Sequence, residues 1–165
     1  MNHLVISFIT PDRPGIVDLI SNAVNKHHGN WQKSSLNHMS GIFAGVVEIA
    51  CADDNIQALS TELLALKGFK IQIEQAKTVD SIEQTQLMLE LTANDRIGIV
   101  NEISSVIHHA GGNLLKLISS QENAPHSGQD LFKAKVTIAI NSSDIDNMIN
   151  ALENLADDLM VDISR

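Results

Sequence analysis

The sequence has 165 residues, 44% of them hydrophobic but only 3% aromatic, and a formal net charge of −9, so it is long enough for one ordinary domain or two small ones with aliphatic cores. Its 11 Lys and Arg form no run of three, which argues against direct binding to nucleic acid or to an anionic membrane surface, and no apolar stretch approaches the roughly 20 residues of a membrane span. The single cysteine, Cys51, excludes an internal disulfide, and the N-terminus lacks the pattern of a signal peptide, so we expect a cytoplasmic protein.

The first half of the chain predicts the order strand, helix, strand, strand, helix, strand. An apolar strand leads into the charged elbow TPDRPG, and apolar residues at helical spacing follow it. Ser40-Gly41 predicts a tight turn between two strands, and Asp53 is a candidate N-cap for the second helix. The expected elements are strand 4–9, a helix with an apolar stripe from Ile16 to Val24, strands 31–39 and 42–51, a helix whose stripe runs from Ile56 to Leu66, and strand 69–74.

The second half repeats the first at an offset of 83 residues. Both helices carry the same apolar stripe in the same register, at positions i, i+1, i+4, i+7 and i+8, so they are expected to bury the same face. The offset superposes Asp12, Arg13, Gly15, Ile16 and Val17 on Asp95, Arg96, Gly98, Ile99 and Val100, and Gly29-Asn30 on Gly112-Asn113.

The second copy predicts its own elements and departs from the first at two places. Ile97 replaces the elbow proline, and the span between the second and third strands is six residues longer, which predicts a mobile loop over residues 121–131. Ser142-Ser143 is the candidate N-cap of the last helix. The expected elements are strands 87–92, 114–120 and 131–140, a helix with an apolar stripe from Ile145 to Leu159, and strand 160–163.

Each copy is therefore expected to form a βαββαβ unit of the ferredoxin-like α+β class, with a four-stranded antiparallel sheet and both helices on one face. The predicted domains are residues 1–77 and 85–165, joined by a polar connector at 78–84. A sheet of this size with a bare face or edge is marginal alone, so we expect the two units to pair side by side.

The repeated elbow has the chemistry to hold an α-amino acid. Unpaired backbone N–H groups and the positive dipole at a helix start suit a carboxylate. Gly15 and Gly98 lack a side chain, which allows close approach, and Pro14 is expected at the first helical position, where a missing N–H costs little. The amides of Asn30 and Asn113 offer donors and acceptors to either end of such a ligand.

A βαββαβ unit with an Asp-Arg-Pro-Gly-Ile-Val elbow and a Gly-Asn that opens the second strand resembles the ACT domains, small regulatory modules that in many relatives bind amino acids. The resemblance covers nearly the whole chain and implies a pocket at an interface between two units. The residues that it assigns to binding are Asp12, Arg13, Pro14, Gly15, Ile16 and Asn30 in one pocket, and Asn94, Asp95, Arg96, Gly98, Ile99 and Asn113 in the other.

Among proteins built only of two such units, the resemblance is greatest to glycine-responsive transcriptional regulators. It implies a small amino acid, glycine first, as ligand, and a DNA-binding activator as protein partner, since the acidic chain shows no helix-turn-helix of its own. A homodimer is compatible with the pattern. The alternative is an ACT-type interaction or dimerisation module that binds no ligand and regulates a metabolic enzyme.

Other interpretations of the same residues remain open at this level. Asp12 and Asp95 could simply cap the helices that follow them. The pairs His27-His28 and His108-His109 do not predict a metal site, because adjacent histidines on a helix point about 100° apart. No catalytic residue and no cofactor is expected, because no acid, base, nucleophile and metal set converges in the sequence.

Overall fold

The computed structural model describes residues 2–76, 84–124 and 128–164. The chain divides into two compact units, Met1–Val79 and Asp80–Arg165. The predicted connector 78–84 lies, apart from Gln84, outside the described residues. Within the described ranges, no helix has the length and apolarity needed to cross a membrane.

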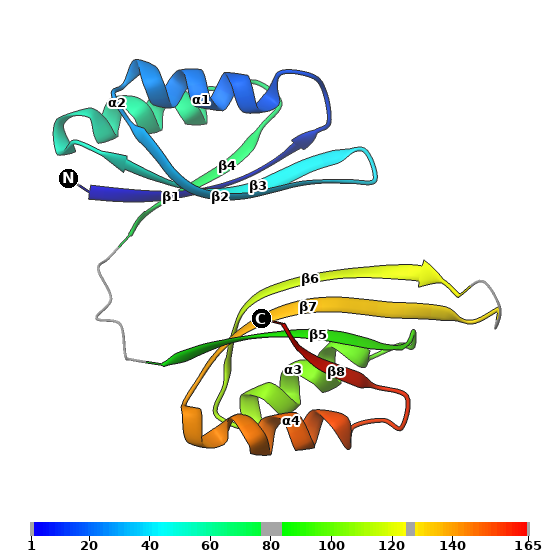
Figure 1. Ribbon diagram of the computed structural model, residues 1–165. Helices are drawn as coiled ribbons and strands as arrows, with labels where there is room; N and C mark the ends of the chain where they lie inside the picture. Colours follow the sequence, from blue (N-terminus) through cyan, green and yellow to red (C-terminus); the bar gives the residue numbers. More distant parts are fainter. Residues whose placement is uncertain (1, 77–83, 125–127, 165) are drawn as a thin grey trace. The chain divides into compact units, whose positions relative to one another are not determined.

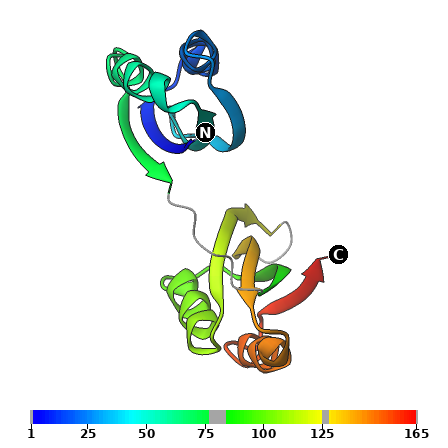
Figure 2. The same cartoon turned by 90° about the vertical axis from the view of Figure 1, so that its left-hand side faces the viewer.

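The first unit is a four-stranded antiparallel sheet with two helices on one face (Figures 1 and 2). The strand order is β2-β3-β1-β4, so the first strand of the chain is central. The helices α1 and α2 contact each other over the buried face. The elements are β1 Asn2–Pro11, α1 Ile16–Lys26, β2 Asn30–Met39, β3 Ile42–Cys51, α2 Asp53–Leu64 and β4 Lys70–Ala76.

The second unit has the same topology, with strand order β6-β7-β5-β8 and both helices on one face of the sheet (Figure 1). The duplicated βαββαβ fold predicted from the sequence is thereby confirmed. Its elements are β5 Thr85–Asn94, α3 Ile99–His109, β6 Asn113–Asn123, β7 Asp130–Ile140, a 3₁₀ turn Ser142–Asp144, α4 Ile145–Glu153 and β8 Met160–Ser164.

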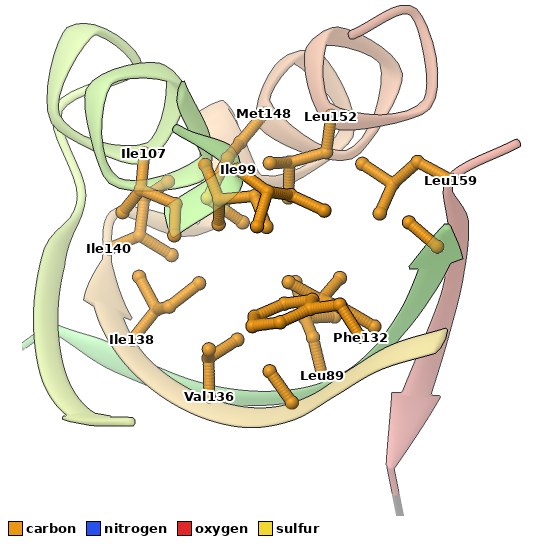
Figure 3. Packing of buried hydrophobic residues seen from close by; sticks show 14 residues of the cluster. Leu89, Ile99, Ile107, Phe132, Val136, Ile138, Ile140, Met148, Leu152 and Leu159 are labelled. Carbon is orange, nitrogen blue, oxygen red and sulfur yellow. The ribbon is translucent and has the colours of Figure 1, made fainter. Parts of the chain in front are cut away.

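Alternation along the central strands produces the two cores. In β1, Leu4, Ile6 and Phe8 are buried beneath the helices, whereas the residues between them lie on the other face. In the second unit Met148 and Leu152 of α4 lie between the helices and the sheet, opposite the strand residues Leu89, Phe132 and Val136 (Figure 3). Helix and strand periodicity therefore converge on one aliphatic layer in each unit.

The predicted C-terminal limits of the last helix and of α2 need correction. The last helix ends at Glu153, so Leu155 and Leu159 of the predicted stripe pack against the core from the connection that follows it. Leu66 likewise lies beyond the end of α2. Apolar spacing continues past these helices because the connecting turns pack on the same core, and such spacing alone does not distinguish a turn from a helix.

The predicted N-caps are also wrong. Ala52 is the N-cap residue of α2, so Asp53 is already helical, and its carboxylate accepts a hydrogen bond from Asn2 at 2.8 Å. In the second unit the serines form a 3₁₀ turn and Asp144 occupies the N-cap position of α4. Neither cap residue makes a side-chain capping hydrogen bond.

The expected loop at 121–131 is largely strand. The hairpin of β6 and β7 pairs as far as Asn123 with Asp130, so only the residues between these two connect the strands. Gln121 helps to hold the extended hairpin in place, because its amide donates to the carboxylates of Asp95 at 2.8 Å and Asp130 at 3.0 Å. Residues 125–127 of the expected loop lie outside the described residues.

A charged contact joins the two helices of the first unit. Lys26 Nζ donates to Glu62 Oε2 at 2.8 Å, and His27 Nε2 donates to the same oxygen at 2.7 Å. These hydrogen bonds, that of Lys26 first, hold the pKa of the Glu62 carboxyl below its ordinary value of 4.5. The contact belongs to the first unit only, since Ala110 and Ala151 stand at the positions that correspond to His27 and Glu62.

Replacing Leu59 with Ala should destabilise the first unit by about 2–5 kcal/mol, because this side chain is fully buried and its removal leaves a cavity. The control is Leu64→Ala on the same helix, where the side chain is 59% exposed and the loss should stay below about 1 kcal/mol. Urea unfolding followed by the fluorescence of Trp31, the only tryptophan and part of this core, measures both. Equal losses would contradict the assigned packing.

Replacing Glu62 with Gln should lower stability in a pH-dependent way. Because the folded-state pKa of Glu62 is depressed, its stabilisation is present above 4.5 and disappears as the pH falls through the lowered value. The urea midpoint of the variant should therefore lie below that of the wild type at pH 7, and the gap should close in acid. Glu74→Gln, at an exposed position of β4 in the same unit, should show no such gap.

Candidate functional site

The elbow of the first unit connects the end of β1 to the start of α1. Gly15 is the N-cap residue and adopts a left-handed conformation with φ of 86°, which favours glycine. A Cβ added to Gly15 would meet no atom within 4 Å, so the space over this residue is open. Helix α1 carries no side-chain capping hydrogen bond, and its first N–H groups therefore face this open space with the positive end of the helix dipole.

Two other loops support the elbow at the same end of the unit. The backbone N–H of Asp12 donates to the carbonyl of Gly41 in the β2–β3 turn at 2.9 Å. Thr10 Oγ1, the buried polar side chain at the end of β1, donates to the carbonyl of Gly68 at 2.9 Å. The elbow is thus held between the hairpin turn and the connection from α2 to β4.

The two charged residues of this elbow point to its rim. The carboxylate of Asp12 lies 3.6 Å from His38 Nε2. Arg13 donates to the carbonyl of Lys67 at 3.3 Å, and its guanidinium lies 5.8 Å from the centre of the Phe69 ring. Neither side chain caps α1, so the interpretation of Asp12 as a helix cap is wrong, and both remain exposed at the entrance to the open space.

The remaining residues assigned to this elbow contribute backbone rather than side chain. Pro14 is exposed and precedes the N-cap residue, so it stiffens the approach to the helix. The prediction that Pro14 occupies the first helical position is therefore wrong. Ile16 is the first helical residue, but its side chain is buried in the core. Only its N–H group is therefore free to face a ligand.

The elbow of the second unit has the same backbone but a different electrostatic arrangement. Gly98 is again a left-handed N-cap, with φ of 90°. Arg96 reaches across it to form two hydrogen bonds to Glu102 in the first turn of α3, Nη1 to Oε1 at 2.7 Å and Nη2 to Oε2 at 2.5 Å. The hydrogen bonds from Arg96 hold the pKa of Glu102 below its ordinary value, and the same bonds raise the pKa of Arg96.

The neighbours of this pair are also engaged. The amide of Gln121 reaches the carboxylate of Asp95, so Asp95 is not a helix cap either. The backbone N–H of Asn94 donates to Asp158 Oδ2 at 2.7 Å. Ile99, like its counterpart in the first unit, buries its side chain in the core, whereas Ile97 stands fully exposed where the first elbow has proline.

The structure does not bring Asn30 together with the first elbow inside one unit. Asn30 pairs with Ala50, which pairs with His3, eight residues along β1 from Pro11. At about 3.3 Å per residue this places Asn30 roughly 26 Å from the elbow, at the opposite end of the sheet. Within one unit Asn30 and the elbow therefore lie apart, and their shared pocket at an interface between two units stays a prediction.

Asn113 is displaced from the second elbow in the same way. It pairs with Ala139, which pairs with Gln86, eight residues before Asn94. The repeated glycine before each asparagine has a packing reason, because a Cβ at Gly112 would lie 3.0 Å from Ile107 and 3.1 Å from Ile138. Gly29 is equally close to its own neighbours, so these glycines allow the chain to pass closely under the helix end.

Several residues that surround the elbows were missed in the sequence. The role of Glu102 could have been predicted from the sequence. An acidic residue in the first turn of a helix, six residues after an elbow arginine, is placed to bind that arginine. No sequence pattern indicates the roles of Lys67, Phe69 and Gln121, because only the sheet pairing brings their segments to this end of each unit.

Three hollows on the described surface have no elbow residue in their lining. One of about 540 Å³ lies beside β1 and β4, with Ser7, Ile9 and Lys70 among its lining residues. Another of about 380 Å³ lies between α3 and α4 and includes His109. No group of three metal-ligating side chains was found among residues 2–76, 84–124 and 128–164, and His27 is hydrogen-bonded to a carboxylate.

Comparison with known proteins places the fold among solved structures. No family model matches the sequence. An unknown protein from Galdieria sulphuraria is 26% identical, with 99% of each chain covered and a TM-score of 0.82. A proposed glycine cleavage system transcriptional repressor is 18% identical, with 99% of this chain and 96% of that chain covered and a TM-score of 0.68.

The ACT domain of the GTP pyrophosphokinase of Chlorobium tepidum matches 49% of this chain and 92% of its own length, at 21% identity and a TM-score of 0.37. The two longer matches span both units, so the duplicated architecture itself is shared and not only the single unit. In its fold, the chain is a tandem of two ferredoxin-like βαββαβ units.

Proposed function

We propose that this protein is a non-enzymatic regulator that senses a small amino acid at the elbow of its first unit. The observation that carries the proposal is the open N-terminus of α1, where a left-handed glycine faces unoccupied space and no side chain caps the helix. An α-amino acid brings a carboxylate to such a site, and the backbone N–H groups of the first helical turn are suited to receive it.

The charges at the rim fit both ends of a zwitterion. The exposed carboxylate of Asp12 is available to an ammonium group, and Arg13 is held only by a carbonyl at 3.3 Å and by the Phe69 ring. Among the described residues, no carboxylate pairs with Arg13, so its guanidinium is free to turn toward a ligand carboxylate.

Glycine is the proposed ligand, and a DNA-binding activator is the proposed partner. The likeness over nearly the whole chain to a proposed glycine cleavage system transcriptional repressor supports both. The net charge of −9 supports an indirect role at the gene, because phosphate backbones bind cationic surfaces. The protein would act in the cytoplasm, restraining its partner through protein contact, as a monomer or homodimer.

A second candidate is an interaction module that binds no ligand and regulates a metabolic enzyme. It is favoured by apolar side chains on the face of the first sheet opposite the helices, where cross-strand pairing places them together. These exposed residues are Ile9, Met39, Ile42 and Val46. In this alternative the elbows would only join strand to helix.

Replacing Gly15 with Asn should weaken glycine binding by at least about tenfold, because the new side chain would project into the space over the helix start. Asn is among the residues that best tolerate a left-handed backbone. Isothermal titration calorimetry with glycine, then with serine and larger amino acids, measures the effect.

The matched control is Gly111→Asn, at a glycine with φ of 80° and open space around it, which should leave binding unchanged. Equal affinity in Gly15→Asn and wild type would remove the first elbow as the site. Absence of binding by the wild type at millimolar concentrations of every amino acid would favour the ligand-free module.

A further inference from the structure

The two elbows share a backbone but differ at one equivalent side chain. At the repeat offset, Glu102 of α3 corresponds to Leu19 of α1. Leu19 is 40% exposed and has no charge to offer the elbow arginine. Arg13 accordingly lies on Lys67 and Phe69, whereas Arg96 turns back over its own helix start to Glu102.

The carboxylate of Glu102 lies close to the left-handed glycine of the second elbow. A Cβ built on Gly98 would be 3.8 Å from Glu102 Oε1, the nearest atom to it, whereas the same position over Gly15 is open. Glu102 also lies in the first turn of α3, where a negative charge is stabilised by the helix dipole. The second helix start thus already has an anion with its own guanidinium counter-ion.

We infer that the Arg96–Glu102 pair closes the second elbow to amino acids, so that the protein binds one ligand per chain, in its first unit. The inference rests on the proposed function, and it identifies the position shared by Leu19 and Glu102 as the residue that decides which elbow is open. Asp18, the acidic residue in the first turn of α1, corresponds to Asn101 and does not substitute for Glu102.

The Arg96–Glu102 pair is a weak surface ion pair, yet it suffices to close the second elbow because the chain itself holds both residues there. Side chains exposed by 37% and 38% form a pair that adds little to the stability of the fold. A tethered carboxylate nevertheless competes at an effective concentration of about millimolar or above. A free amino acid must displace it, break two charge-assisted hydrogen bonds and approach a site that is already occupied.

The first experiment needs no ligand. Carbon-detected NMR should show the Glu102 carboxyl titrating below its ordinary value, and the Arg96 guanidinium should give slowed, hydrogen-bonded side-chain signals. Arg13, held only by the Lys67 carbonyl at 3.3 Å, should rotate and exchange faster than Arg96. A freely rotating Arg96 beside an ordinary Glu102 titration would overturn the closure, whatever the protein binds.

The second experiment counts sites by calorimetry with glycine and then serine. Wild type should bind one equivalent per chain, and Glu102→Leu, which reproduces the first elbow, should bind two. Leu19→Glu restores the six-residue Arg–Glu spacing in the first unit and should weaken its site by at least about tenfold. If Glu102→Leu fails to fold by circular dichroism, Glu102→Gln replaces it, because it removes the charge and keeps the shape.

Matched controls make the same exchanges at exposed helix ends. Glu153→Leu and Leu64→Glu should bind as wild type does. Two equivalents in the wild type, or one in both Glu102 variants, would overturn this inference and leave the sensor intact. Absence of binding by the wild type and every variant would overturn the sensor itself and the closure with it.

Discussion

Burial of one face of a four-stranded antiparallel sheet beneath two amphipathic helices is the constraint on which each unit depends. The aliphatic core is placed by alternation in central strands such as β1 and by the stripes of the helices. Because β1 lies between β3 and β4, its end meets the turn of one neighbour and the loop before the other. The elbow is thus fixed by Gly41 and Gly68 without a side-chain helix cap.

On this common frame the two elbows reach different electrostatic states. Both have a glycine in the left-handed conformation at the helix start, because residues with a side chain rarely adopt this backbone conformation. In the first, the acidic residue of the first helical turn is Asp18, and Arg13 lies on the Phe69 ring without a carboxylate partner among the described residues. In the second, Glu102 supplies the anion and Arg96 neutralises it. Duplication has preserved the backbone geometry, while the position shared by Leu19 and Glu102 differs between the two helices and with it the partner of the elbow arginine.

Much of the fold was predictable from the sequence, but the end of the last helix was not. Strands, helices and repeat followed from periodicity, yet Leu155 and Leu159 were assigned to a helix that ends at Glu153. Core contact imposes the same apolar spacing on a turn that packs beside a helix. The separation of Asn30 from the elbow within one unit was not predicted, although Asn30 follows the helix and lies at the far end of the sheet from the elbow. An 11-residue helix separates its two ends by about 16 Å, which sequence proximity conceals.

The sequence by itself determined the duplicated βαββαβ order, the aliphatic cores and the two glycine elbows, because each depends on local spacing and backbone preference. Only the tertiary structure decided what surrounds those elbows. Lys67, Phe69 and Gln121 reach them through strand pairing between distant segments. The direction in which Arg13 turns depends on partners that such pairing brings within reach, and no local pattern specifies a contact between residues more than fifty positions apart. Arg96 instead binds Glu102, which lies only six residues away.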